Sequence, residues 1–563
     1  MEESKIGYKS WKWTDAHFCN LPTHTLLYPG MSCGISTTPQ TNVYGHAKVI
    51  DPDGSNKFLV ASRVGKFISL EYQITMDKLA PSAKIIPFSY IPAGAELVSL
   101  DVICKSVHHK RIVVGVTFIK FEEESEDVES TCKQYLNLYS LQEEYSGFDN
   151  IDDCFSQSID LDFTPYQLTH TSIFVAGKLE SVFLLIGSDC KIHMYREVSV
   201  SLFLLDSDHG DGMNHIQSKN QAMQQTFREF PTDDCFPEFK DISTCVHWID
   251  IVYYNQYSRR LTARGHRDGG ITVSHVNVDS NEMLSSWSLQ HDSPITCIKI
   301  FTLEYSVSQP GFISQRKENS DKEVDPVFHV LALSALEPAA VYRNVLSNGL
   351  KEPLVLPQSN KFDVPLCVCI VDIDFDGCNE IMIGTYGQEL LAYKFISQKP
   401  MSKSGKSSGN EKLDEFGDIN DPNRNRHLSD EKEQRLTPVD IQDSLRSKSH
   451  ENLNFKHSTE NITQSNKQHK QEDYMGKKCD HFQLLWQKSF ACPVMGIDRL
   501  DIMGDGMEDL VVVTLKGVHI IQPDLQEIAK VCLERMNNIT QKKHKIKSDK
   551  HLSNVKSVQN KEK

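Results

Sequence analysis

A two-strand pattern of apolar and polar positions recurs along the chain. In each copy an apolar run ends at Gly or Ser, a few polar residues follow, and an alternating apolar run closes near an aromatic residue. Such runs predict β-hairpins, because β-branched and aromatic residues favour half-buried sheet positions. The copies lie at 58–72, 112–139, 182–195, 261–275, 330–342, 381–393 and 510–521.

Further strands flank most of these hairpins. Apolar runs precede them at 97–103, 168–175, 246–254, 295–301, 366–373 and 494–500, and candidates for an outer strand follow at 85–90, 283–289, 353–357 and 482–490. Three or four strands per unit, repeated every roughly 45 to 70 residues, are typical of a β-propeller. A strand that is polar on one face cannot bury itself alone, and radial packing gives each apolar face a partner.

The sequence therefore predicts an all-β, seven-bladed β-propeller. The expected blades are 41–93, 94–165, 166–240, 241–291, 292–358, 359–490 and 491–523. The last of these has only three strands. A segment within residues 8–40 is expected to supply the fourth strand and close the ring.

One short acidic loop carries the candidate site. Residues 372–380 read Asp-Ile-Asp-Phe-Asp-Gly-Cys-Asn-Glu. Aspartates at alternate positions followed by Gly fit a calcium loop, in which oxygens converge on one cation and a later carboxylate closes the shell. The candidate Ca²⁺ ligands are Asp372, Asp374, Asp376, Cys378 and Glu380. The alternative is that Asp and Gly only shape a tight turn by accepting bonds from local backbone N–H groups.

The loop leads into a strand and not into a helix, which argues against an EF-hand and favours FG-GAP-like propeller repeats. A second, metal-like copy contains Asp501, Asp505 and Asp509. Its third position is Met503, a thioether where a hard cation requires oxygen, so this copy is interpreted as degraded. Asp101, Asp250, Asp372 and Asp498 end predicted inner strands at comparable points, which is interpreted as repeated turn chemistry.

Two parts of the chain depart from the strand pattern. Residues 398–479 are polar and poor in large apolar side chains, which predicts a disordered insert within blade six. From residue 524 onward, Leu525, Ile528, Cys532 and Met536 lie three and four apart, which predicts an amphipathic helix. Its apolar stripe is expected to pack on its own domain, with a partner as the alternative. The expected segments are thus 1–40 at the N-terminus, a propeller over 41–397 and 480–523, the insert 398–479, a helix at 524–541, and a basic, disordered tail at 542–563.

Composition limits the classes of function. A formal net charge of −16 disfavours a nucleic-acid binder, whose surface has to be basic. No apolar run reaches the length of a membrane span, so we expect no transmembrane segment, and the scattered cysteines suggest a reducing, cytoplasmic setting. We expect no enzyme, because no nucleophile elbow, kinase signature or zinc motif is present. The glycine-rich stretch 265–270 joins two strands and opens no helix, which disfavours a phosphate cradle.

Six strings in this sequence resemble the kaptin family. They are Thr-Asn-Val-Tyr-Gly at 41–45, Phe-Ser-Tyr-Ile-Pro at 88–92, Val-Val-Gly-Val-Thr-Phe-Ile-Lys at 113–120, Leu-Glu-Pro-Ala-Ala-Val-Tyr-Arg at 336–343, Gly-Thr-Tyr-Gly-Gln-Glu-Leu-Leu at 384–391 and Leu-Lys-Gly-Val-His at 515–519. The matches run in order from about residue 41 to the helix near 540. The insert and the longer N-terminus depart from the family pattern.

The resemblance implies a non-catalytic subunit of the KICSTOR complex. The expected partners are a second FG-GAP-class propeller subunit and a large scaffold subunit, and through them the GATOR GTPase-activating complex. The implied setting is the lysosomal membrane, to which the protein would be peripheral, and the implied role is restraint of TOR complex signalling when amino acids or glucose are scarce. No cofactor is required on this interpretation. The alternative is an F-actin-associated protein of actin-rich cell projections such as lamellipodia and stereocilia.

Overall fold

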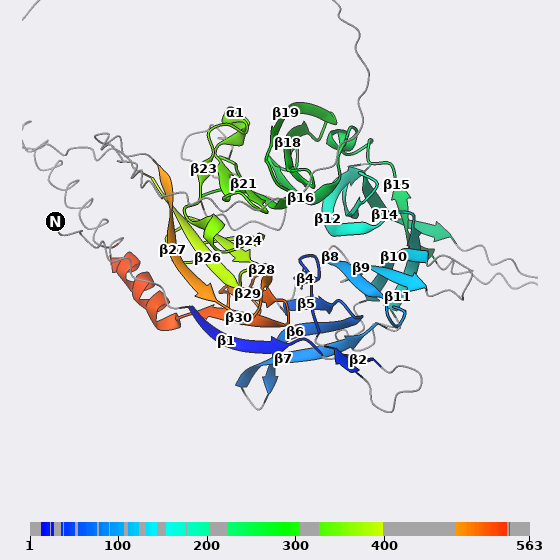
Figure 1. The fold of residues 1–563 in the computed structure, drawn as a ribbon, viewed down its shortest axis with the longest axis horizontal. Coiled ribbons are helices and arrows are strands. Elements are labelled where there is room, and N and C mark those ends of the chain that lie inside the picture. The colour runs from blue at the N-terminus through cyan, green and yellow to red at the C-terminus, as the bar shows by residue number, and fades with distance from the viewer. Residues whose placement is uncertain are drawn as a thin grey trace, which may run out of the picture. The chain divides into compact units, whose positions relative to one another are not determined.

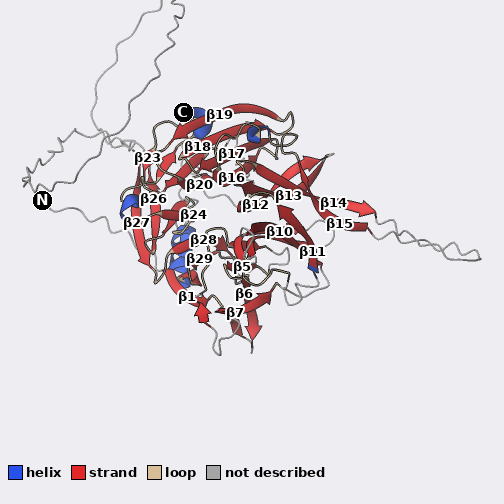
Figure 2. Ribbon diagram, turned by 45° about the vertical axis from the view of Figure 1, so that its right-hand side comes forward, coloured by secondary structure: helices blue, strands red, loops and turns tan. Residues whose placement is uncertain are grey.

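The fold was analysed in a computed structural model, in which most of the described residues are in β-strands (Figure 2). The predicted insert and the predicted basic tail lie outside the described residues. The structure describes residues 13–22, 24–26, 35–37, 39–50, 55–75, 78–88, 90–105, 111–122, 131–142, 154–175, 177–201, 223–304, 326–397, 480–537 and 540.

The described strands form seven four-stranded antiparallel sheets and one two-stranded hairpin. The first four sheets contain, in order, β4 (His46–Val49), β5 (Lys57–Ser62), β6 (Lys66–Thr75) and β7 (Lys78–Pro87); β8 (Glu96–Lys105), β9 (Arg111–Glu122), β10 (Thr131–Gln142) and β11 (Phe155–Leu161); β12 (Pro165–Val175), β13 (Lys178–Gly187), β14 (Ile192–Ser201) and β15 (Met223–Phe230); and β16 (Val246–Tyr254), β17 (Arg259–His266), β18 (Gly270–Asn277) and β19 (Glu282–Gln290).

The remaining sheets follow the same order along the chain, except that the last one combines both ends. They contain β20 (Ile295–Phe301), β21 (His329–Ser334), β22 (Ala340–Tyr342) and β23 (Leu354–Val355); β24 (Pro365–Val371), β25 (Glu380–Thr385), β26 (Glu389–Ile396) and β27 (His481–Ser489); and β28 (Val494–Leu500), β29 (Asp509–Thr514), β30 (Gly517–Pro523) and β1 (Trp13–Asn20). The separate hairpin pairs β2 (His24–Leu26) with β3 (Ile35–Thr37).

The seven sheets are arranged as a closed ring. The first strand of each sheet contacts the first strand of the next, from β4 through β8, β12, β16, β20 and β24 to β28, and β28 contacts β4 again. Figure 1 shows these strands around a common centre. The contacts and the sheet order confirm the predicted seven-bladed propeller.

Apolar clusters fill the spaces between successive blades. Each cluster draws its side chains from two neighbouring sheets, as when Leu59 and Phe67 of blade one pack with Val116 of blade two. The last cluster joins Val511 of blade seven to Val60 of blade one. Middle strands such as β21, β25 and β29 are buried at every position, because both of their faces meet a neighbouring blade.

The N-terminal strand β1 completes blade seven. It runs antiparallel to β30, with Trp13 opposite Pro523 and Asn20 opposite Gly517, and with one irregularity between Asp15 and His17. The indole N–H of Trp13 also donates to the carbonyl of Ile373 in blade six, at 3.3 Å. Blade seven therefore combines three strands from residues 494–523 with β1 from the N-terminal part of the sequence.

Ion pairs between inner strands join three pairs of neighbouring blades. Asp101 contacts the His170 ring at 2.8 Å, Asp250 contacts Lys299 at 2.8 Å, and Asp498 contacts Lys48 at 2.9 Å. All three aspartates lie inside strands. The interpretation of these positions as turn chemistry was therefore wrong for these three, because each carboxylate reaches across to the next blade.

Helices are few among the described residues. They are α1 (Val345–Asn348), the 3₁₀ turns η2 (Pro237–Phe239) and η3 (Ser359–Lys361), and a C-terminal helix at 525–537. In the C-terminal helix only Ile528 is buried, whereas Leu525, Leu533 and Met536 are each at least 60% exposed. The expectation that its apolar stripe packs on the propeller thus holds at one position. None of the described helices is both long and apolar enough to cross a bilayer.

Candidate functional site: two acidic loops

The first acidic loop joins β24 to β25 in blade six. Its backbone is shaped by Asp372, whose two carboxylate oxygens accept hydrogen bonds from the N–H groups of Asp376 (3.0 Å) and Gly377 (2.8 Å). Phe375 and Gly377 have φ values of 54° and 89°, and Gly377 adopts this conformation without steric cost. Asp372 is thus committed to the turn, as the alternative interpretation of the loop expected.

The aspartates still converge. One ligand oxygen from each of Asp372, Asp374 and Asp376 lies within 4.8 Å of the others, as a cation site requires. Among the predicted ligands, Cys378 does not belong to this group and is an exposed residue, and partial desolvation of its thiol raises the thiol pKa. Glu380 begins β25, is fully buried, and accepts the N–H of Ile373 at 3.0 Å.

A lysine ammonium lies among these carboxylates. Nζ of Lys394, on β26, lies 2.6 Å from Asp374, 2.7 Å from Asp376 and 2.7 Å from Glu380. Burial by itself would lower the pKa of Lys394, but hydrogen bonds to the three carboxylates raise it, so the ammonium stays charged. This donor set does not fit Ca²⁺ while Lys394 is present, because a divalent ion would have to share the same oxygens with a fixed positive charge.

The buried glutamate depends on this lysine. Burial raises the pKa of Glu380 to about 8, and its hydrogen bond to Lys394 acts in the opposite direction. A carboxylate at a fully buried position is costly unless it is paired and hydrogen-bonded. Lys394 supplies the pairing, and the Ile373 N–H supplies a further hydrogen bond.

The loop also connects two blades. The side-chain amide of Asn379 donates to the carbonyls of Thr302 (2.9 Å) and Glu304 (3.2 Å), which follow β20 in blade five. The backbone N–H of Asn379 donates to Leu303 at 2.7 Å. The acidic turn therefore fixes the junction of blades five and six as well as its own conformation.

The second acidic loop joins β28 to β29 in blade seven and repeats the turn geometry. Asp501 accepts the N–H groups of Gly504 (2.7 Å), Asp505 (3.1 Å) and Gly506 (2.9 Å). Asp509 begins β29 as Glu380 begins β25, and burial raises its pKa to about 7. One of its carboxylate oxygens, Oδ2, is buried and has no hydrogen-bond partner in the described part of the chain.

The register of the two hairpins makes Gln522 the counterpart of Lys394. Ile381 pairs with Tyr393 in blade six, and Leu510 pairs with Ile521 in blade seven, so the next residue outward is Lys394 in one hairpin and Gln522 in the other. Met503 replaces the second aspartate of the loop, and Gln522 lies against its sulfur. The second loop thus has one carboxylate fewer than the first and has no lysine at the position of Lys394. This difference indicates that Lys394 balances the charge of the first loop.

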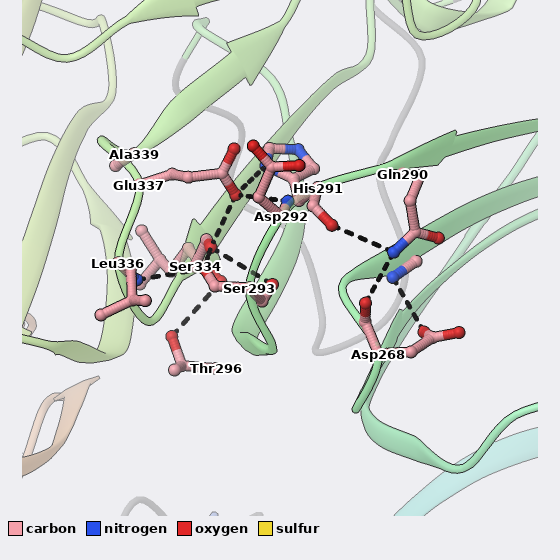
Figure 3. A network of polar contacts seen from close by, with 12 residues as sticks. Asp268, Gln290, His291, Asp292, Ser293, Thr296, Ser334, Leu336, Glu337 and Ala339 are labelled. Atoms are coloured by element: carbon pink, nitrogen blue, oxygen red, sulfur yellow. Dashed lines mark hydrogen bonds and ion pairs between the residues drawn. The ribbon is translucent and has the colours of Figure 1, made fainter. Parts of the chain in front are cut away.

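A third polar cluster superficially resembles a hydrolase triad (Figure 3). Glu337 accepts a hydrogen bond from the Ser334 hydroxyl (3.0 Å) and contacts the His291 ring (3.0 Å). The other ring nitrogen of His291 contacts the Tyr342 hydroxyl at 2.9 Å, and Ser334 is fully buried. In a triad the histidine lies between carboxylate and serine. Here the carboxylate lies between the other two, so the cluster joins the β19–β20 connection to the β21–β22 loop.

Comparisons with known proteins extend over most of the propeller. A family model described as KICSTOR complex protein kaptin matches residues 34–410 and 430–533. The KICSTOR complex protein kaptin of Mus musculus is 32% identical over 508 residues, which are 90% of this chain and 90% of the mouse protein. The ranges matched by the family model contain every strand from β4 to β30.

Proposed function

Because the chain belongs to the kaptin family, we propose that it is a non-catalytic scaffold subunit of a KICSTOR-type complex. The observation that carries the proposal is the extent of the match, which includes strands of all seven blades and 90% of the mouse protein. A propeller presents broad faces and many loops to partners and needs no chemistry to act as a scaffold. The acidic loops support this role, because Asp372 and Asp501 shape turns and the other carboxylates of the first loop bind Lys394.

The mechanism we propose is assembly. The propeller pairs with a second FG-GAP-class propeller subunit, and the pair docks on a large scaffold subunit at the lysosomal membrane. The complex then holds the GATOR GTPase-activating complex in place and restrains TOR complex signalling when amino acids or glucose are scarce.

We propose the outer hairpin of blade one as the surface that meets the partner propeller. Ile74, Leu79 and Ile85 are 79%, 44% and 59% exposed. Ile74 pairs with Leu79 across β6 and β7, and Ile85 pairs with Ile68, so the regular register places all three side chains on one face. Exposed apolar side chains that gather on one face mark interaction surfaces more often than scattered ones do.

The test is co-purification of full-length protein from fed and from starved cells. Wild-type protein is expected to recover a second propeller subunit and a large scaffold subunit. The double variant Ile74→Asp/Ile85→Asp is expected to lose them. The matched control is Leu336→Asp, at an 81% exposed position in the β21–β22 loop, and it is expected to retain them.

Two results would change the proposal. Recovery of actin without the other subunits would favour the F-actin alternative, which co-sedimentation of full-length protein and of residues 1–540 then tests directly. Recovery of both subunits by the double variant at the wild-type level would exclude the β6–β7 hairpin as the docking face and leave the scaffold role standing.

A further inference from the structure

A cavity of about 660 Å³ lies on blade four, in the range that small-ligand pockets occupy. Its wall on one side is η2 and the segment after it, and on the other side it is the sheet of β17, β18 and β19. The sheet contributes mostly polar side chains, namely Arg264, His266, Thr272, Ser274, Ser286 and Ser288.

The strand register explains why these side chains share one face. Arg264 pairs with Thr272, which pairs with Ser288, and Thr262 pairs with Ser274, which pairs with Ser286. Paired residues on antiparallel strands point to the same side of the sheet. The opposite face of β17 carries Leu261 and Ala263, which pack in the apolar cluster shared with blade five.

Arg264, which lines this cavity, forms no ion pair of its own among the described residues, although the charge of Glu238 acts on it. The residue is only 6% exposed, and Nε and Nη1 are buried without hydrogen-bond partners among the residues that the structure describes. Burial lowers its pKa, but an arginine stays protonated at neutral pH. A buried cation without a partner is costly, and retaining one indicates that something compensates it.

The neighbouring carboxylate cannot fill this role, because it is already used. Glu238 accepts two hydrogen bonds at 2.8 Å from the buried guanidinium of Arg260, and a third at 2.8 Å from Thr262. Arg260 and Arg264 therefore share one buried carboxylate between two positive charges. The other carboxylates of the lining, Asp241 and Asp268, are exposed, and one oxygen of Asp268 accepts the Gly270 N–H at 3.0 Å.

Hydroxyl groups line the same cavity as the guanidinium. Thr272 and Ser274 lie on β18 and Ser286 and Ser288 on β19, while Thr244 faces them from the other wall and contacts the His266 ring at 2.9 Å. Figure 3 shows the neighbouring end of the same blade, where the Gln290 amide donates to the backbone of Asp268 at 2.6 Å. Hydroxyls together with a guanidinium are the donors that phosphate and carboxylate oxygens accept from.

We propose that this cavity binds a small oxyanion ligand, one that carries a phosphate or a carboxylate group, with Arg264 as its counter-charge. The proposed site would bind the anion through side chains of the sheet. It therefore differs from a phosphate cradle, in which the backbone N–H groups of a glycine-rich loop bind the anion. It also lies away from the β6–β7 hairpin and does not depend on assembly with other subunits.

The test is titration calorimetry of the full-length protein with inorganic phosphate and, separately, with acetate. Both are compared with chloride at equal ionic strength. Wild-type protein is expected to bind at least one of the two probes in a saturable way. Arg264→Gln is expected to weaken that binding by about 10- to 100-fold, the effect of losing a charged hydrogen-bond donor.

The matched control is Arg267→Gln, an exposed arginine three residues away that does not line the cavity, and it is expected to bind like the wild type. Thr272→Val keeps the shape of the side chain and leaves the Arg264 charge in place, and it is expected to weaken anion binding severalfold. If Arg264→Gln does not fold, this variant tests the proposed site. Binding of phosphate alone or of acetate alone identifies the anionic group. No binding above the chloride reference, or wild-type affinity in Arg264→Gln or in Thr272→Val, overturns the proposal.

Discussion

Replacing Lys394 by Met tests whether a lysine takes the place of a calcium ion in blade six. The substitution keeps an unbranched side chain of similar length and removes the ammonium that lies 2.6–2.7 Å from three carboxylates. Asp374, Asp376 and Glu380 then face one another without a cation. Like charges at this separation disfavour ionisation, so the loop is expected to loosen or to take up protons or a metal.

The expected loss of stability can be bounded from burial. The Lys394 side chain is 14% exposed and Glu380 is fully buried, so their contact counts as a buried pair, whereas Asp376 is 41% exposed and contributes little. Removing one partner of a buried pair costs about 3–5 kcal/mol. We expect about 3 kcal/mol in EGTA, a large part of the roughly 5–15 kcal/mol that holds a typical protein folded.

Calcium is expected to reverse part of that loss in the variant. A ligand that binds only the folded state stabilises it by about 2.7 kcal/mol at 100 times its Kd. Urea denaturation in EGTA and in CaCl₂ measures both effects, with Lys361→Met, an exposed lysine outside the loop, as the control. A loss below about 1 kcal/mol in Lys394→Met, or an equal calcium response in the wild type, would refute the reasoning.

Two further predictions concern blade seven. Burial raises the pKa of Asp509 from 3.8 to about 7, so the stability associated with its protonated form is complete below pH 4 and is lost as the pH rises through 7. Asp509→Asn is expected to be more stable than the wild type at pH 8, by up to about 4 kcal/mol, and to show no such advantage at pH 4 in denaturant melts. Deleting residues 1–22, which removes β1, is expected to lower Tm by about 5 °C or more, since losing a packed aromatic such as Trp13 costs about 3 kcal/mol. Deleting residues 1–12 retains β1 and is the control, and equal melting of the two deletions would show that β1 contributes nothing.

The sequence indicated the inner and middle strands because those strands are apolar. The runs at 295–301 and 494–500 coincide with β20 and β28, whose buried positions carry no charged side chain and are mostly apolar. The outer strands β11 and β15 were not identified. Their sequences, Phe-Ser-Gln-Ser-Ile-Asp-Leu and Met-Gln-Gln-Thr-Phe-Arg-Glu-Phe, are mostly polar, because an outer strand of a blade has less neighbouring surface to meet.

The acidic loop was found from its spacing, but the lysine among its carboxylates was not. Lys394 is 14 residues from Glu380, and only the hairpin register brings the two together. That register could have been inferred from the tight turn between β25 and β26, and comparing Lys394 with Gln522 would then have indicated the charge balance. Arg264 gave no such signal, because the absence of a partner for a buried charge is visible only in three dimensions.

The pairing of β1 with β30 also bears on how the molecule is made. Thr14 and Gln522 are joined by a hydrogen bond although they are 508 residues apart in the chain. At a ribosome rate of about 5–20 residues per second, roughly half a minute or more separates the synthesis of the two strands. During that interval β1 has no strand to pair with, and an unpaired strand readily recruits other chains. Chaperone binding to the nascent N-terminal segment would therefore protect β1 until β30 has been synthesised.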